Sequence, residues 1–356
     1  MLRFYDRIMR KIIYILLALL SFSHTKAQDP HHSHFYAVPL LMGPSFAGST
    51  GGTRVAINAR NQWTAIPQQY NTASIMFDHY FYGTRHGLGA VLHRDQAGAG
   101  KLATTYLQAQ YAYSINASKN IAFRPGMQVS FVNRHIDYSK TVFGDQLDFI
   151  ENRPNSIEPA LEENNNYLDF GASLLGIYKS FWFGGTLDHL IQPNQSLNNE
   201  NSIVPLKISF YTGMRFNIQT KFNNKRQRDN MYVMMHFNKQ DTFKQMLYGA
   251  YWERQKTLMG IWYRGMPYLK AYQSYMNTDA LILMFGYTFR QFLFLYSYDL
   301  TLSKLTANSA GSHEITIVWQ RPASANEQKH KNRFKIVPCP MQDNYKSGRQ
   351  HNQHNM

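Results

Sequence analysis

Cysteine is almost absent from this sequence of 356 residues, in which Cys339 is the one thiol. A single thiol cannot form a disulfide within the chain, so packing and hydrogen bonding must hold the fold together. Charged residues are also scarce, at 17%. After the first 27 residues, no run approaches the ~18 consecutive apolar residues of a membrane-spanning helix. A disulfide framework and helical membrane spans are therefore excluded.

Aromatic residues are plentiful, with 24 Tyr and 23 Phe, and hydrophobic residues make up 44% of the chain. The mean hydropathy is nevertheless −0.43, so the apolar residues are interleaved with polar ones. Amide and hydroxyl side chains supply much of that polarity. Such interleaving at this aromatic content predicts β-strands that are wetted on one face.

Residues 1–27 have the pattern of a secretory signal peptide. A short apolar run, IIYILLALLSF, follows a cluster of basic residues, and Ala27 supplies a small residue at the predicted cleavage site. The basic residues are Arg3, Arg7, Arg10 and Lys11. The run is too short for a single-pass anchor, which needs about 20 residues. Because export argues against nucleic acid as a partner, the net charge of +15 favours binding to an acidic surface or protein.

Apolar and polar residues alternate along most of the remaining chain. In 53–63, for example, Ile57 lies on one face of the predicted strand. Arg54, Asn58 and Arg60 share the other face, which would suit a polar lumen. The segments predicted to be strands are 53–63, 74–81, 86–94, 102–113, 121–132, 167–178, 180–190, 205–219, 228–238, 242–252, 256–264, 278–289, 291–301 and 311–320.

Most of these segments span roughly 9–15 residues, whereas strands of soluble proteins commonly have ~5–6. Strands that cross a bilayer at a tilt need ~9–11 residues, and single-chain bacterial barrels have an even number of strands. Length and count therefore predict an all-β fold, a transmembrane antiparallel β-barrel of about 14 strands over residues 53–320. We expect the last strand, 311–320, to close against the first and leave no open edge. A soluble secreted β-sandwich is the alternative that these lengths disfavour.

Two segments flank the predicted barrel. Residues 28–52 are punctuated by Pro and Gly, and we expect them to form an N-terminal lead-in or plug inside or beneath the barrel, because they carry Phe35, Tyr36 and Phe46. Residues 321–356 carry seven Lys or Arg against two acids and are expected to be a disordered basic tail. An even number of strands puts this tail in the compartment where the barrel begins, by convention the periplasm.

The predicted connections differ in length. Several are tight and polar, whereas residues 137–166 form a long acidic stretch. This stretch is either a local contact surface or a solvated loop with a single helical turn. If partners bind outside the membrane, we expect them to use 137–166 and the tail at 321–356.

Residues of the kinds that bind metals or catalyse reactions are present, but without the spacing of a site. His31, His32 and His34 crowd the expected mature N-terminus with no established ligand pattern. Two acid–histidine pairs are adjacent in sequence, so on a strand their side chains point to opposite faces and cannot form a dyad. These pairs are Asp188–His189 and His313–Glu314. The glycine-rich stretches 48–52 and 98–100 lack phosphate-loop spacing and are predicted to be turns. We predict no catalytic, cofactor-binding or metal site.

Eight blocks of sequence, in this order, resemble one known family. They are QDPHHSHFYAVPLLMGPSFAGS (28–49), RNQW (60–63), RDQAGAG (94–100), FGDQL (143–147), FWFGGTLDHLIQPNQS (181–196), SYDLTLSKL (297–305), GSHEITI (311–317) and VPCP (337–340). The chain is similar through these blocks to the PorP/SprF outer-membrane proteins of Bacteroidota, which are associated with type IX secretion and gliding motility. The chain continues beyond VPCP, where the family pattern ends sooner.

The resemblance implies a non-enzymatic outer-membrane β-barrel with no catalytic residues and no cofactor. It also implies partners: components of the type IX machinery, a secreted cargo protein such as a gliding adhesin, and the lipid of the outer membrane. The barrel would assist secretion or surface attachment of that cargo. The alternative is a transport channel for small or apolar molecules, in which 28–52 would act as a plug.

Overall fold

The computed structural model describes residues 29–65, 70–81, 84–98, 101–118, 120–138, 163–198, 201–222, 225–270, 276–302 and 310–321. One compact unit begins at His32. Its strands are β1 (Thr53–Gln62), β2 (Tyr70–Phe81), β3 (His86–Ala97), β4 (Leu102–Tyr113), β5 (Ile115–Asn116), β6 (Ile121–His135), β7 (Asn164–Tyr178), β8 (Phe181–Asp188), β9 (Lys207–Phe222), β10 (Lys225–Gln240), β11 (Phe243–Arg254), β12 (Thr257–Lys270), β13 (Met276–Phe289), β14 (Phe292–Thr301) and β15 (Ser312–Arg321).

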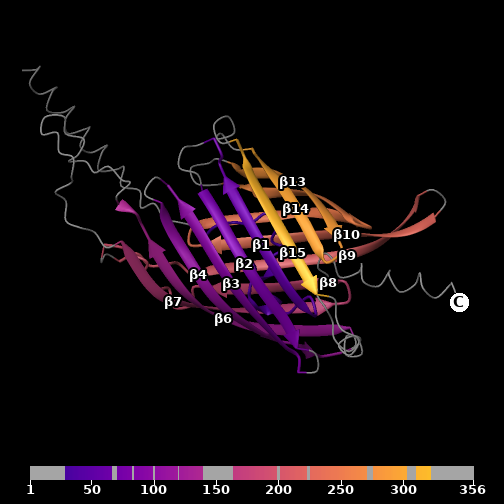
Figure 1. The fold of residues 1–356 in the computed structure, drawn as a ribbon, viewed down its shortest axis with the longest axis horizontal. Helices are drawn as coiled ribbons and strands as arrows, with labels where there is room; N and C mark the ends of the chain where they lie inside the picture. The colour runs from indigo at the N-terminus through magenta and orange to yellow at the C-terminus, as the bar shows by residue number, and fades with distance from the viewer. Residues whose placement is uncertain are drawn as a thin grey trace, which may run out of the picture. The chain divides into compact units, whose positions relative to one another are not determined.

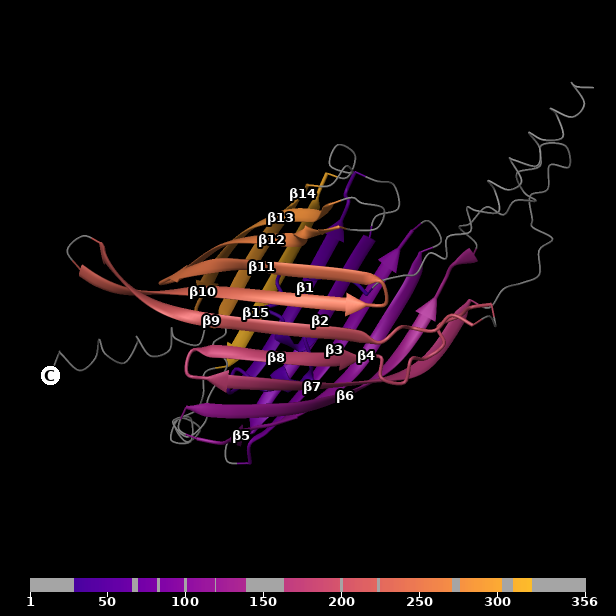
Figure 2. The ribbon, with the colours of Figure 1, turned by 180° about the vertical axis from the view of Figure 1, so that it is seen from behind.

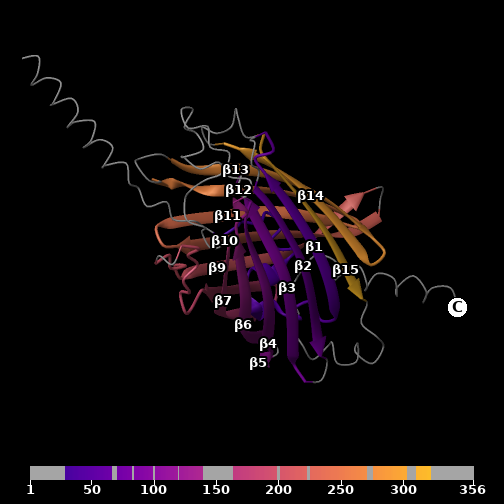
Figure 3. The same ribbon diagram turned by 60° about the vertical axis from the view of Figure 1, so that its left-hand side comes forward.

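These strands form one antiparallel sheet that closes on itself. Each strand pairs with the next along the chain, except that β4 pairs with β6 and the two-residue β5 lies beside β6. β15 pairs with β1 over its whole length, from Thr53 opposite Arg321 to Gln62 opposite Ser312. Figure 1 and Figure 3 show β14, β15, β1 and β2 as one continuous wall. The predicted 14-strand barrel and its closing pair are confirmed, with β5 as one extra short strand.

The two faces of the wall differ as the alternation predicts. On β2, Ile75 and Phe77 are 52% and 45% exposed, whereas Ser74 and Asp78 are each 1% exposed. The same alternation of buried and exposed residues runs along β14 and β15. Apolar residues therefore cover the outside, as is required when lipid surrounds a closed barrel. The inner face carries buried polar residues together with a buried apolar cluster that includes Trp182, Trp262 and Ile282.

Several strands begin or end at other residues than predicted. β2 starts at Tyr70 instead of 74, and β8 covers Phe181–Asp188 instead of 180–190. The largest difference is in β12, which ends at Lys270 instead of 264. β9 and β10 are also longer than predicted, since they remain paired up to Phe222 and Lys225. Because this added stretch is mostly polar, apolar alternation could not mark it, although the backbone ladder does not need an apolar face.

The barrel has a short-turn rim and a long-loop rim. The short-turn rim holds the start of β1, the end of β15 and the two-residue connections that follow β7, β9, β11 and β13. Lys179, Gln255 and Arg290 in three of these turns have φ of 52°, 53° and 53°, as tight hairpin turns require. The connections from β6 to β7 and from β8 to β9 lie at the long-loop rim.

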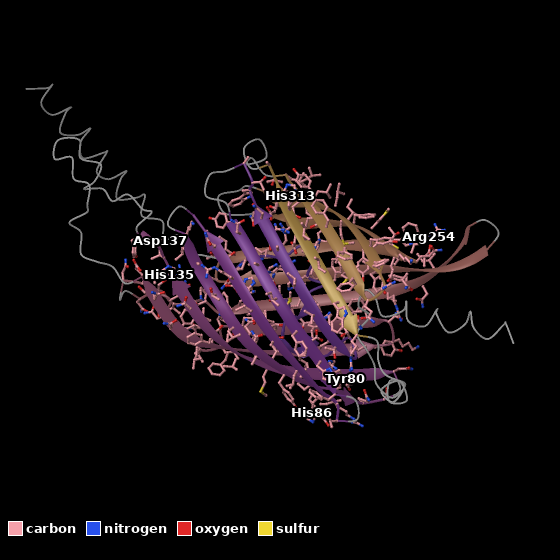
Figure 4. All side chains as sticks on the ribbon, viewed as in Figure 1. Tyr80, His86, His135, Asp137, Arg254 and His313 are labelled. Carbon is pink, nitrogen blue, oxygen red and sulfur yellow. The ribbon has the colours of Figure 1, made fainter. Side chains whose placement is uncertain are left out.

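Figure 4 marks both rims. It labels Tyr80 and His86 at the short-turn rim and His135 and His313 at the long-loop rim. Most of the 137–166 stretch and all but the first residue of the 321–356 tail lie outside the described residues, as does the segment up to residue 28. Among the described residues, no helix is long and apolar enough to cross a membrane.

Candidate functional site: the luminal plug

The lumen contains the segment His32–Gly52, called the plug below. Residues 33–40 and 42–52 are all buried. Two 3-10 turns, η1 (Pro39–Leu41) and η2 (Pro44–Phe46), begin at prolines. Proline fixes φ and donates no hydrogen bond, so this segment folds into turns and does not join the sheet as another strand. Its backbone groups must then find partners among the inward side chains of the barrel.

At its N-terminal end the plug is held by two carboxylates. The backbone N–H groups of Ser33 and His34 donate to the two oxygens of Glu314, at 2.7 and 3.1 Å. The hydroxyl of Ser33 donates to Asp299 at 2.8 Å. These acids lie on β15 and β14, so the closing strands of the barrel bind the start of the plug.

Two arginines neutralise these acids. Arg60 of β1 donates to Glu314 at 3.0 Å and to Asp299 at 2.8 Å. Arg264 of β12 lies 2.9 Å from Asp299. We call Arg60, Arg264, Asp299 and Glu314 the latch. All four are at most 4% exposed. Two positive and two negative charges balance in a site without water access, where an unpaired charge would be strongly unfavourable.

His34 adds a titratable group to this end of the plug. Its Nδ1 lies 2.7 Å from the hydroxyl of Thr316 and 3.7 Å from Glu314. Among the described residues, its Nε2 has no hydrogen-bond partner. Burial lowers the pKa of His34, and the nearby negative charge of Glu314 only partly opposes this shift. The imidazole is therefore neutral when the plug is seated.

The next part of the plug packs on aromatic side chains. The ring of Tyr36 stacks on Trp262 and Tyr251 with centroid distances of 5.2 and 4.9 Å. Phe35 meets Trp262 edge to face at 5.3 Å. The hydroxyl of Tyr36 donates to the sulfur of Met284. These contacts come from β11, β12 and β13, the wall that is turned forward in Figure 2.

The middle of the plug is held by single polar contacts. Gln110 on β4 donates to the carbonyl of Leu40 at 3.0 Å. Thr186 on β8 donates to the carbonyl of Met42 at 2.7 Å. Gln110 also donates to Gln128 of β6, which ties neighbouring strands together beneath the plug.

At the short-turn rim the plug is held mainly through its carbonyls. Arg124 of β6 donates to the carbonyl of Ser45 at 3.0 Å and to that of Ala47. The N–H of Gly48 donates to Asp78 at 3.0 Å, and Arg54 binds the same carboxylate at 2.7 Å. We call the segment Pro44–Gly48 the foot.

The foot also lies closer to the wall than a side chain would permit. A Cβ on Gly126 would lie 2.4 Å from the nitrogen of Ser45, and one on Gly87 would lie 2.0 Å from the oxygen of Ala47. Glycine in a strand interior often marks such a close backbone approach. Between latch and foot, the plug thus contacts strands from every side of the barrel.

The histidines and acid–histidine pairs noted in the sequence have definite places. His32 meets His93 edge to face at 5.4 Å. In the pair His313–Glu314, only the acid faces the lumen, whereas His313 lies beside Tyr296 and Tyr298. In the described part of the chain, no group of three His, Cys, Asp or Glu side chains is arranged to hold a metal ion.

In the pair Asp188–His189 the two side chains have separate partners. His189 Nδ1 lies 2.7 Å from Asp169 on β7, whereas Asp188 accepts from Gln128 at 2.9 Å. Neither adjacent pair forms a dyad with itself. Alternation of side chains along β15 separates His313 from Glu314, whereas His189 follows the last residue of β8 and has φ of 60°.

The latch is the feature that sequence reasoning missed. Arg60 was predicted to be on a polar face, but its pairing with Asp299 and Glu314 was not. The signal was available: once β15 is taken to close on β1, the antiparallel register places Arg60 directly opposite Glu314. Arg264 gave no such signal, because its contact with Asp299 crosses β13.

Comparisons with known proteins agree with this architecture. A family model described as "Type IX secretion system membrane protein PorP/SprF" matches residues 24–319. No curated protein matches the chain.

Similar solved structures include the Pseudomonas putida toluene transporter TodX, with 8% identity, a TM-score of 0.39 and coverage of 78% of this chain and 92% of the other. A Pseudomonas aeruginosa FadL homologue has 10% identity, a TM-score of 0.38 and coverage of 78% and 94%. For CdiB from Acinetobacter baumannii, the identity is 5%, the TM-score 0.41 and the coverage 76% and 60%.

The family match extends over most of the chain, so the chain belongs to the PorP/SprF family of type IX secretion system membrane proteins. Its closed barrel with an apolar outer face is an outer-membrane fold. The chain is therefore an outer-membrane protein.

Proposed function

We propose that this barrel is a non-enzymatic component of type IX secretion that assists the export or surface attachment of partner proteins and does not itself form the conduit. The supporting observation is the plug, whose backbone is hydrogen-bonded to side chains from strands all around the lumen. A barrel filled by its own chain leaves the rims and loops as the surfaces that a partner can reach.

The chemistry of the lumen supports a structural role for its charged residues. Arg60, Asp299 and Glu314 are the most obvious candidates for reactive groups in a polar lumen. Each of them is engaged with another latch residue or with the plug backbone. A buried and fully paired ion network of this kind holds a structure in one register, which fits an attachment protein.

The partners that this role implies are components of the secretion machinery on the periplasmic side and an exported cargo protein. The two rims are suited to separate tasks. By the convention for outer-membrane barrels, the short-turn rim faces the periplasm and the long-loop rim faces the cell exterior. Cargo would then be retained at the exterior while the machinery is contacted at the opposite rim.

Electrical recording tests whether the lumen is closed. The purified full-length mature protein is inserted into planar bilayers beside a variant with Glu314→Ala, which removes the acceptor of two plug N–H groups. We expect the wild type to show almost no steady conductance and the variant to show frequent openings, because the plug has lost its anchor. Robust wild-type conductance or solute flux would instead support the transport channel.

Secretion itself is measured in the native bacterium. Deleting the gene should remove one or more exported proteins from the cell surface, and the wild-type gene should restore them. The restored strain is solubilised in detergent to identify the proteins that co-purify with the barrel. Unchanged surface proteins after the deletion would refute the proposed function.

A further inference from the structure

One hairpin of the barrel extends beyond its neighbours. β9 and β10 pair with each other up to Phe222 and Lys225. On one side, pairing with β8 ends at Phe181 opposite Met214, where the N–H of Arg215 still donates to the carbonyl of Ser180. Figure 2 shows this hairpin running past the ends of β8 and β11.

The other side of the hairpin is free in the same way. Pairing of β10 with β11 ends at Asn230 opposite Glu253. Among the described residues, 216–222 and 225–228 therefore form strand pairs only between β9 and β10, and we call them the arm. A two-stranded ribbon is marginally stable by itself and presents unpaired backbone groups on both edges.

The arm lies outside the apolar band of the barrel. Phe216 and Ile218, at its base, are 43% and 37% exposed. The residues beyond them read QTKFNNKRQRDN, with four basic residues and one acid. Such a sequence is unsuited to lipid. Because the arm starts at the short-turn rim, it lies on the same side of the barrel as Thr53 and Arg321.

The backbone of β9 indicates which groups are free. The N–H of Arg215 points toward β8, and N–H groups along a strand alternate between its two edges. The N–H groups of Asn217, Gln219 and Lys221 therefore point to the open edge. This edge offers three donors in a row, which an added extended strand can satisfy.

We propose that the arm is a docking edge for an extended acidic segment of a periplasmic protein, which adds as a further strand along β9. This inference rests on the proposed function, because it assigns the contact between barrel and machinery to the arm. The open ladder supplies backbone hydrogen bonds. The four basic residues supply charge complementarity and attract an acidic partner from a distance.

A defined peptide tests the mode of binding. The probe is a fluorescent 10-residue peptide of alternating Glu and Val, with a Lys–Val peptide as its counterpart, and binding to the detergent-solubilised full chain is followed by anisotropy. We expect the wild type to bind the Glu peptide and not the Lys peptide. Gln219→Pro should weaken binding about tenfold, because it removes an edge N–H and leaves the ladder to β10 intact.

Charge is tested with a matched pair of variants. Lys225→Glu combined with Arg226→Glu should reduce binding of the Glu peptide about tenfold or more. The control is Lys256→Glu combined with Arg290→Glu, which makes the same charge change in two other turns of the same rim and should have little effect. Equal loss in both variants would overturn the arm as the specific site.

A lipid surface is the competing target and has its own outcome. Vesicles of phosphatidylglycerol, with phosphatidylcholine as reference, are offered to the same variants. If Gln219→Pro binds the Glu peptide like the wild type and only the charge variants lose binding to anionic vesicles, the arm contacts headgroups and strand addition is wrong.

The same variants in the native bacterium separate this inference from the function on which it rests. We expect Gln219→Pro and the Lys225→Glu, Arg226→Glu variant to insert into the outer membrane but to lower surface display of exported proteins. Normal display in both variants, with loss of display after gene deletion, would refute the arm alone. Normal display after gene deletion would refute the proposed function.

Discussion

The plug is held at its two ends by opposite chemistry. At the latch, the carboxylate of Glu314 accepts two N–H groups from the plug backbone. At the foot, the guanidinium of Arg124 donates to plug carbonyls. In both places a buried segment without strand partners has its backbone satisfied by charged side chains, which form stronger hydrogen bonds than neutral groups do.

The two ends also differ in what their anchoring depends on. The latch depends on charge balance, because removing one member leaves the others buried and uncompensated. The foot depends in addition on space, because it lies against Gly87 and Gly126 at distances that no side chain would permit. One segment is thus held by charge at the latch and by both charge and close packing at the foot, so the two anchors should fail under different changes.

Loss of the latch should have the largest effect. Glu314→Ala removes the acceptor for the N–H groups of Ser33 and His34 and leaves Arg60 without one of its two carboxylate partners. We expect the seated plug to lose about 3–5 kcal/mol, the usual penalty for breaking a buried pair. The measurement is labelling by a membrane-impermeant maleimide at Ala37→Cys, which is buried in the plug. Cys339→Ser makes the background thiol-free.

The control for this prediction is an acid of the same type outside the lumen. Glu163→Ala changes an exposed residue at the long-loop rim and should leave the labelling of Ala37→Cys at the wild-type rate. If Ala37→Cys is labelled at that same rate in Glu314→Ala, the latch does not hold the plug.

Crowding of the foot should have the second-largest effect. In Gly126→Ala the new methyl group would lie 2.4 Å from the nitrogen of Ser45, so the foot must move. We expect destabilisation of about 1–3 kcal/mol, as for overpacked cores. The measurement is labelling of Ser49→Cys in the same thiol-free background.

A second glycine provides the matched comparison. A Cβ on Gly52 would meet its nearest atom, the oxygen of Arg321, at 3.4 Å, which is an ordinary contact. In Gly52→Ala, the maleimide should therefore label Ser49→Cys as slowly as it does in the protein that keeps Gly52. Equal labelling of Ser49→Cys in Gly126→Ala and in Gly52→Ala would mean that the foot is not sterically fixed.

The barrel itself could be predicted from the sequence to a large extent. Period-two alternation with long strands gave the wall, its two faces and its closing pair, because lipid outside and polar groups inside impose that pattern on every strand. It could not give the extension of β9 and β10 to Phe222 and Lys225, since a polar ribbon outside the membrane has no apolar face to leave a pattern.

The contacts of the plug were harder to predict from the sequence. Ser33 and Glu314 are 281 residues apart, and no local periodicity links them. Only Arg60 opposite Glu314 follows from the register of the closing strands. Gly126 could be recognised as a site of close backbone approach in a strand. The sequence around it does not indicate that the approaching backbone is that of Ser45.

The smallest expected effect is a pH dependence of the latch that the foot does not share. His34 is neutral when seated, because burial lowers its pKa below the usual 6.5. A released plug exposes His34 to water, where it takes up a proton below about 6.5. The released state then binds more protons than the seated one, so the latch is at full strength above that pH and weakens as pH falls. We expect wild-type openings in planar bilayers to become more frequent at pH 5.5 than at pH 7.5, on the basis of that window.

Two variants show whether this response belongs to the latch. His34→Asn keeps a polar side chain beside Thr316 and removes one titrating ring. It is combined with His32→Asn, because burial also lowers the pKa of His32, to about 4, and openings of this double variant should be independent of pH in the same range. Gly126→Ala loosens the foot without altering either histidine, so it should raise openings at both pH values and keep the pH response. A pH response that survives in the double variant would assign the titration to another group and leave the latch held by its arginine–carboxylate pairs alone.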